Sequence, residues 1–132
     1  NPMLEIYQKT ISEPIRFDGV GLHSGINSTV TILPGVDDQG IIFKRVDLKR
    51  NNLVQANYKN VSSAKLCTTL ENEFGVKVST VEHLLAALYI ANIDNAVIEI
   101  NNEEVPIMDG SAKEFLNILD QIETQTLKKK RK

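Results

Sequence analysis

The sequence has very little cysteine: Cys67 is the only one, so no disulfide can form within the chain. A chain without disulfides is typical of a reducing compartment, and we expect the cytoplasm. The sequence also lacks an apolar run of the roughly 18 to 20 residues that a membrane-spanning helix needs. No basic region followed by an apolar stretch stands at the N-terminus, so a signal peptide is not expected.

An excess of charge of one sign is also lacking, because the formal net charge is −2. Five of the 15 basic residues lie at positions 128–132, so the rest of the chain is acidic. Aromatic residues are few as well, with three Tyr and four Phe. An acidic body with few aromatic side chains argues against a nucleic-acid partner.

What the sequence does contain is typical of one soluble domain. The chain has 132 residues, of which 42% are hydrophobic and 24% are charged, and these values exclude disordered and collagen-like proteins. We expect an N-terminal extension at 1–8, in which Asn1-Pro2 before Met3 resemble a cloning remnant. The domain is expected at 9–126. The basic tail, 127–132, is expected to be either a solvated end or the start of a link to a second domain.

Alternating apolar and β-branched residues predict strands, mostly in the first half of the chain. Turn-forming residues between two of these strands, at 34–40, predict a hairpin that pairs 28–33 with 41–46. Asn101-Asn102 predict a second hairpin, between 95–100 and 103–107. The expected strands cover residues 10–17, 28–33, 41–46, 53–58, 66–70, 76–78, 95–100 and 103–107.

Helical spacing appears twice. In the first helix the apolar stripe is preceded by Ser79 as N-cap, with Glu82 three residues later as in a capping box. In the second helix Ser111 and Glu114 repeat this pattern. The stripes are Val81, Leu84, Leu85 and Leu88, then Phe115, Leu116, Ile118, Leu119 and Ile122. We therefore predict an α+β fold, a two-layer sandwich of a mainly antiparallel β-sheet with two helices packed on one face.

Chemistry could reside at Glu82 and His83, in the first turn of the first predicted helix. The partial positive charge of a helix N-terminus favours an uncharged imidazole, which can bind a metal, and an ionised carboxylate, which can act as a general base. Each residue also has an ordinary explanation. Glu82 fits the capping box, and His83 could be a satisfied or solvent-facing histidine.

Other candidates are weaker. His23 lies among three glycines in Gly19-Val20-Gly21-Leu22-His23-Ser24-Gly25, which could approach a ligand or could be a plain turn. Cys67 could ligate zinc or act as a nucleophile, but the role of a small half-buried apolar residue is the more common one for such a cysteine and is favoured here. Asp109 is explained by a turn before the second helix. Catalytic zinc normally has three protein ligands, so the chain offers either no metal site or part of one.

Five motifs in register resemble one known family, the zinc-dependent UDP-3-O-acyl-N-acetylglucosamine deacetylases of bacterial lipid A biosynthesis. The resemblance extends from about residue 9 to the end of the second predicted helix. The motifs are Gly-Val-Gly-Leu-His-Ser-Gly (19–25), Leu-Cys-Thr (66–68), Ser-Thr-Val-Glu-His-Leu (79–84), Ile-Asp-Asn (93–95) and Pro-Ile-Met-Asp-Gly-Ser (106–111).

This resemblance implies two similarly folded domains with the active site between them, of which this chain resembles the first. It implies that His83 is a Zn²⁺ ligand and that Glu82 is the general base. It also implies that Leu66 and Cys67 line the metal cleft, and that His23 and Asp109 lie near the substrate. Two further ligands, a general-acid histidine and most of the acyl-chain passage would come from the C-terminal domain.

The implied reaction is hydrolysis of the acetamide of UDP-3-O-acyl-N-acetylglucosamine to the free amine and acetate, and we expect the isolated chain to be inactive. The alternative is a non-enzymatic α+β binding module for RNA or protein. In that case the basic tail would supply salt-sensitive phosphate contacts.

Overall fold

A five-stranded sheet forms the centre of the molecule, with strand order β2-β3-β9-β4-β5. The computed structural model describes residues 6–57, 61–62, 68–107, 113–121 and 123–131. Three strands, β6 to β8, form a second sheet, and β1 pairs with β10 in a third. The elements are β1 (Tyr7–Ile11), β2 (Ile15–Val20), β3 (Asn27–Pro34), β4 (Ile41–Arg45), β5 (Leu53–Gln55), β6 (Val61–Ser62), β7 (Thr69–Glu71), β8 (Lys77–Ser79), α1 (Glu82–Ile90), β9 (Ala96–Ile100), α2 (Lys113–Asp120) and β10 (Thr124–Lys130).

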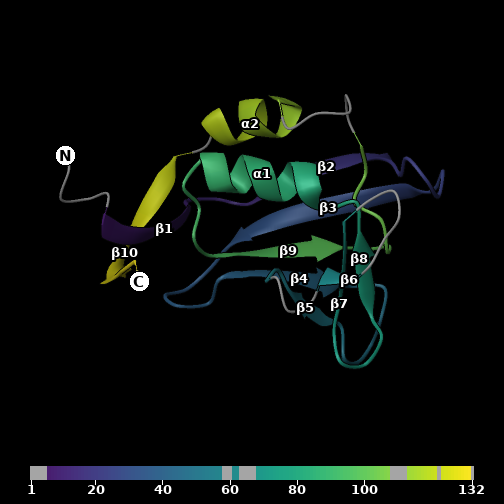
Figure 1. The fold of residues 1–132 in the computed structure, drawn as a ribbon. Coiled ribbons are helices and arrows are strands. Elements are labelled where there is room, and N and C mark those ends of the chain that lie inside the picture. Colours follow the sequence, from purple (N-terminus) through teal and green to yellow (C-terminus); the bar gives the residue numbers. More distant parts are fainter. Residues whose placement is uncertain (1–5, 58–60, 63–67, 108–112, 122, 132) are drawn as a thin grey trace.

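Both helices lie on the same side of the central sheet, with the β6–β8 sheet near one end and the β1–β10 pair near the other (Figure 1). All pairings in the central sheet are antiparallel except that of β4 with β9. The predicted fold class, an α+β sandwich with a mainly antiparallel sheet, is confirmed.

The core lies between the central sheet and the helices. One residue in two along each central strand faces the helices, which explains the alternating pattern of the sequence. On α1, Leu84 and Leu88 are fully buried, and on α2, Phe115 packs edge-on against Phe17 with ring centroids 5.1 Å apart. The helix-facing residues of the sheet include Phe17, Val30, Ile32, Phe43, Val54, Ile98 and Ile100.

Both predicted hairpins are wrong, and β9 is the reason. Residues 28–33 and 41–46 do form strands, but β9 lies between them, antiparallel to β3 and parallel to β4. Because both edges of β9 are then occupied, residues 103–107 cannot pair with it. They make isolated bridges instead, Glu104 with Ser79 and Ile107 with Val20.

Residues 10–17 also do not form one strand. The segment is divided into β1 and β2, which belong to different sheets. No strand was expected at 124–130, where β10 pairs antiparallel with β1. This segment has too few apolar residues to show a buried face, so only pairing with β1 makes it a strand.

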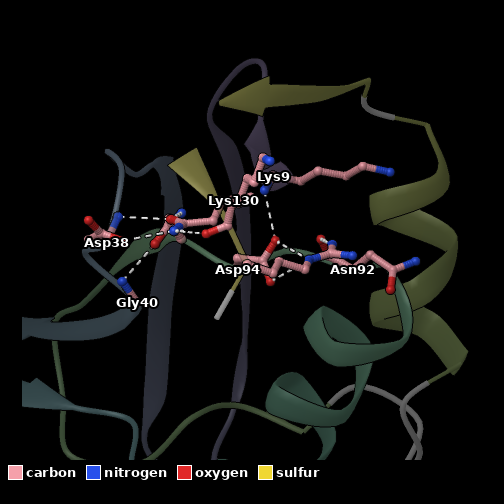
Figure 2. A network of polar contacts seen from close by, with 9 residues as sticks. Lys9, Asp38, Gly40, Asn92, Asp94 and Lys130 are labelled. Carbon is pink, nitrogen blue, oxygen red and sulfur yellow. Dashed lines mark hydrogen bonds and ion pairs between the residues drawn. The ribbon is translucent and has the colours of Figure 1, made fainter. Parts of the chain in front are cut away.

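Polar contacts fasten the β1–β10 pair to the central sheet (Figure 2). The Asp94 carboxylate accepts hydrogen bonds from the Lys9 backbone N–H (2.8 Å) and from Arg131 Nε (3.0 Å). Gln8 donates from Nε2 to Asp38 (2.8 Å). The last strand is thereby joined to loops that precede β4 and β9.

Candidate active site

The first turn of α1 carries the two residues with the strongest predicted roles. The helix begins at Glu82, its N-cap is Val81, and no side chain caps it. Ser79 is the last residue of β8, where it pairs with Thr69. The capping-box explanation of Glu82 is therefore wrong, because Ser79 lies within a strand and Glu82 is the first helical residue rather than the third.

The Glu82 carboxylate contacts Thr68, the residue directly before β7. Its Oε2 accepts a hydrogen bond from the backbone N–H of Thr68 at 3.0 Å. The Thr68 carbonyl oxygen in turn accepts from the N–H groups of Thr80 (2.9 Å) and Val81 (3.3 Å). Thr68 is thus both a donor and an acceptor toward the first residues of α1 and the turn before it. The Glu82 side chain is half-buried at this contact.

His83 is also half-buried, so neither residue of the pair points fully into the hydrophobic interior. Among the residues that the structure describes, the His83 imidazole has no hydrogen-bond partner. Its ring nitrogens are therefore not committed to any described neighbour. A ligand or metal could therefore bind either nitrogen without displacing a hydrogen bond to a described residue.

His23 lies in an exposed turn between β2 and β3. The turn is closed by backbone hydrogen bonds from Gly21 to Ile26 (2.9 Å) and from Gly25 to Gly21 (3.0 Å). Gly25 has a φ of 69°, in the left-handed region that favours glycine. The plain-turn explanation accounts for this local shape, but not for what holds the turn in place.

Glu104 holds it. This residue is only 3% exposed. Its Oε1 accepts from the Ser24 N–H at 2.8 Å, and both carboxylate oxygens lie within 3.2 Å of the His23 backbone nitrogen. Its Oε2 also accepts from the Thr80 hydroxyl at 2.8 Å. One buried carboxylate therefore joins the His23 turn to the residue two positions before Glu82.

Hydrogen bonding also sets the charge of this carboxylate. Burial by itself raises the pKa of Glu104. The hydrogen bonds from Ser24, Thr80 and His23 favour the ionised form and outweigh burial, so the pKa lies below its usual 4.5. Glu104 is consequently an anion at neutral pH.

Thr80 has a strained backbone. Its φ is 60°, which is rare for a β-branched residue and costs about 1–3 kcal/mol. Such strain persists only where the surroundings enforce it, and it is frequent at functional sites. Here the Thr68 carbonyl and the Glu104 carboxylate both bind Thr80, and they hold the turn that leads into Glu82.

The sequence reasoning missed Glu104, Thr80 and Thr68. For Glu104 the sequence did contain one indication. Glu103 and Glu104 are consecutive in an extended stretch, so their side chains point to opposite faces and one of the two must face inward. Nothing in the sequence says which one, because the donors to Glu104 lie 24 to 81 residues away. Of the other predicted site residues, Leu66, Cys67 and Asp109 lie outside the described residues.

Within the described ranges, no three His, Cys, Asp or Glu side chains come close enough together to hold a metal ion. The described part of the chain therefore does not form a complete three-ligand zinc site. In that same part, neither helix is long and apolar enough to span a membrane.

The basic tail bears on the RNA-binding alternative. Lys129 is ion-paired with Asp38 (3.6 Å), and Arg131 with Asp94 (3.0 Å). Arg131 is thereby engaged within the fold and is less suited to phosphate contacts, whereas the side chain of Lys129 is 63% exposed and its ion pair is weak.

Comparison with known proteins gives a consistent result. The sequence model of a family described as UDP-3-O-acyl N-acetylglycosamine deacetylase matches residues 8–132. The chain is similar to the UDP-3-O-acyl-N-acetylglucosamine deacetylase of Vibrio cholerae serotype O1 (strain ATCC 39541 / Classical Ogawa 395 / O395), with 47% identity over 122 residues covering 92% of this chain and 40% of that protein. It is 46% identical to the protein of the same name from Vibrio vulnificus (strain YJ016), over 127 residues covering 95% of this chain and 42% of that protein. The chain thus spans about two-fifths of the length of these curated relatives.

Proposed function

The chain belongs to the UDP-3-O-acyl N-acetylglycosamine deacetylase family, and we propose that it is the N-terminal part of such an enzyme. The complete enzyme hydrolyses the acetamide of UDP-3-O-acyl-N-acetylglucosamine, releasing acetate, in bacterial lipid A biosynthesis. It works in the cytoplasm. A C-terminal domain, the partner of this chain, completes the active site, so the chain alone is inactive.

The half-buried Glu82 carboxylate beside His83 is the observation that carries this proposal. The Thr68 N–H occupies Oε2 of Glu82, and Oε1 has no partner among the described residues. Oε1 is the oxygen that we assign to accept the proton of the attacking water. Because the capping role is excluded, Glu82 has no helix N–H to satisfy and remains available for this task.

His83 fits one zinc ligand of a shared site. Catalytic zinc normally takes three protein ligands and an open position, and a neutral imidazole is one of its preferred donors. His83 offers such a donor, and the remaining ligands come from the second domain. When bound, zinc would supply Lewis-acid polarisation of the acetamide carbonyl.

Replacing Glu82 with glutamine in the complete enzyme tests the proposal. The amide oxygen of the new side chain can still accept the Thr68 hydrogen bond, so the fold should be kept, whereas the general base is lost. We expect the rate of acetate release to fall by about 10²- to 10⁴-fold, with little change in the melting temperature. Glu103→Gln, at an exposed carboxylate in the same protein, is the matched control and should keep full activity. A Glu82→Gln enzyme that retains its activity but melts earlier would contradict the assignment.

A further inference from the structure

Glu104 connects two segments that carry predicted site residues, although it is itself hidden from solvent. On the basis of the proposed function, we propose that Glu104 is a positioning residue. Its carboxylate fixes the His23 turn relative to the first turn of α1, and so sets the place of His23 with respect to Glu82 and His83. It touches no reacting atom.

The backbone around Glu104 is hydrogen-bonded to two different strands, and these contacts fix the position from which its side chain extends. Ser79 in β8 donates to the carbonyl of Glu103 (2.8 Å) and accepts from the N–H of Val105 (3.0 Å). Ser28 in β3 donates from its hydroxyl to the Glu104 carbonyl at 3.1 Å. Glu104 is therefore fixed to the strand that precedes α1 and to the strand that follows the His23 turn.

The turn is shaped to receive this carboxylate. Gly21 lies directly against it, and a Cβ at this position would collide with Glu104 Oε1 and lie 2.9 Å from Glu104 Cδ. The absence of a side chain at Gly21 lets the His23 and Ser24 N–H groups approach the two oxygens. Backbone donors that converge on one ionised acceptor form charge-assisted hydrogen bonds, which are shorter and stronger than neutral ones.

The contacts of this side chain require an acceptor oxygen that faces the His23 turn. The His23 and Ser24 N–H groups can only donate, whereas the Thr80 hydroxyl can donate or accept. Glutamine at position 104 would satisfy all three partners if its oxygen faced the turn and its NH₂ group donated to the Thr80 hydroxyl. Alanine would satisfy none of them.

The link is separate from the contact that holds Glu82. Loss of the Glu104 carboxylate removes one of the two contacts that hold Thr80, but the Thr68 carbonyl still accepts from the Thr80 and Val81 N–H groups, and the Glu82–Thr68 hydrogen bond does not involve Glu104. We therefore expect the general base to stay in place while the His23 turn is released. A misplacement of about 1 Å can cost an enzyme about 100-fold in rate.

The first measurement is amide hydrogen exchange by NMR on the 132-residue chain, comparing Glu104→Ala, Glu104→Gln and the exposed control Glu103→Ala. We expect Glu104→Ala to abolish the protection of the His23 and Ser24 amides while Ile98 in β9 keeps its own. Glu104→Gln should retain most of the protection, and Glu103→Ala should match the wild type.

The second measurement is steady-state kinetics of the complete deacetylase with the same substitutions. We expect kcat/KM to fall about 10- to 100-fold in Glu104→Ala, mainly through KM, with substantial recovery in Glu104→Gln. The pH dependence of kcat, which reports the general base, should not change.

Two results overturn the proposal. One is unchanged protection of the His23 and Ser24 amides in Glu104→Ala. The other is a loss of protection that extends equally to Ile98, which would make Glu104 a stability residue of the whole fold. If the complete wild-type enzyme shows no deacetylation, the proposed function fails, whereas the exchange pattern still decides the role of Glu104.

Discussion

Gly21 and Gly25 flank His23 in the same turn, and they offer a matched pair of alanine substitutions. A Cβ at Gly21 would collide with Glu104 Oε1 and Ser24 Oγ. A Cβ at Gly25 would meet no atom within 4 Å, but the φ of 69° there is unfavourable for alanine. The first substitution therefore tests the contact with Glu104, and the second tests backbone strain alone.

The two costs differ in origin and in size. For Gly25→Ala we expect a loss of about 1–2 kcal/mol in the free energy of unfolding, the cost of a left-handed alanine. For Gly21→Ala, overpacking costs about 1–3 kcal/mol. Displacing the carboxylate adds about 1–3 kcal/mol for each buried donor left without an acceptor. We expect a total of about 3 kcal/mol or more, and hence a clearly larger effect at Gly21.

Urea unfolding of the 132-residue chain, followed by circular dichroism, measures both values. A double-mutant cycle with Glu104→Ala isolates the cause. If the collision with the carboxylate dominates, Gly21→Ala should cost at least about 1 kcal/mol less once the carboxylate is gone. The reasoning is refuted if Gly21→Ala costs no more than Gly25→Ala, or if the two substitutions in the cycle are simply additive.

Two further predictions concern protons and metal. Because the pKa of Glu104 is lower in the folded state than its usual 4.5, the carboxylate contributes stability above that pH and loses it as the pH falls through the folded-state value. Urea midpoints measured from about pH 7 to about pH 3 should therefore decline less in Glu104→Gln than in the wild type, and parallel curves would contradict this. Isothermal titration of the isolated chain with zinc should show only weak binding that His83→Ala reduces further, because one imidazole cannot hold the ion tightly. Tight, stoichiometric binding without a second domain would rule out a shared site.

Local periodicity was a reliable guide where neighbours in sequence are also neighbours in space. Leu84 and Leu88 recur at helical spacing, and both side chains are buried in the hydrophobic core on the inner face of α1, as predicted. Ile98 and Ile100 alternate with half-buried residues, and they form a strand, as predicted. Such patterns arise within a few residues, so no knowledge of the rest of the fold is needed.

Strand pairing could not be obtained in this way. The turn formers at 34–40 favour a hairpin, but β9, which follows much later in the chain, takes the place between β3 and β4. Its residues Ala96, Ile98 and Ile100 are fully buried, which is the composition of a central strand. Burying them against two neighbours outweighs the local preference of the turn, because hydrophobic burial is worth more than a turn propensity.

At the candidate site, too, some features follow from the sequence and others only from the tertiary structure. The sequence alone determined the residue types and their spacing: a glutamate next to a histidine, followed by a helical stripe, and a glycine-rich turn around His23. Only the tertiary structure decided that Glu82 binds Thr68 instead of capping the helix, and that Glu104, not Glu103, is the buried carboxylate. The physical reason is that the donors to Glu104 lie in segments 24 to 81 residues away along the chain, which come together only when the sheets have formed.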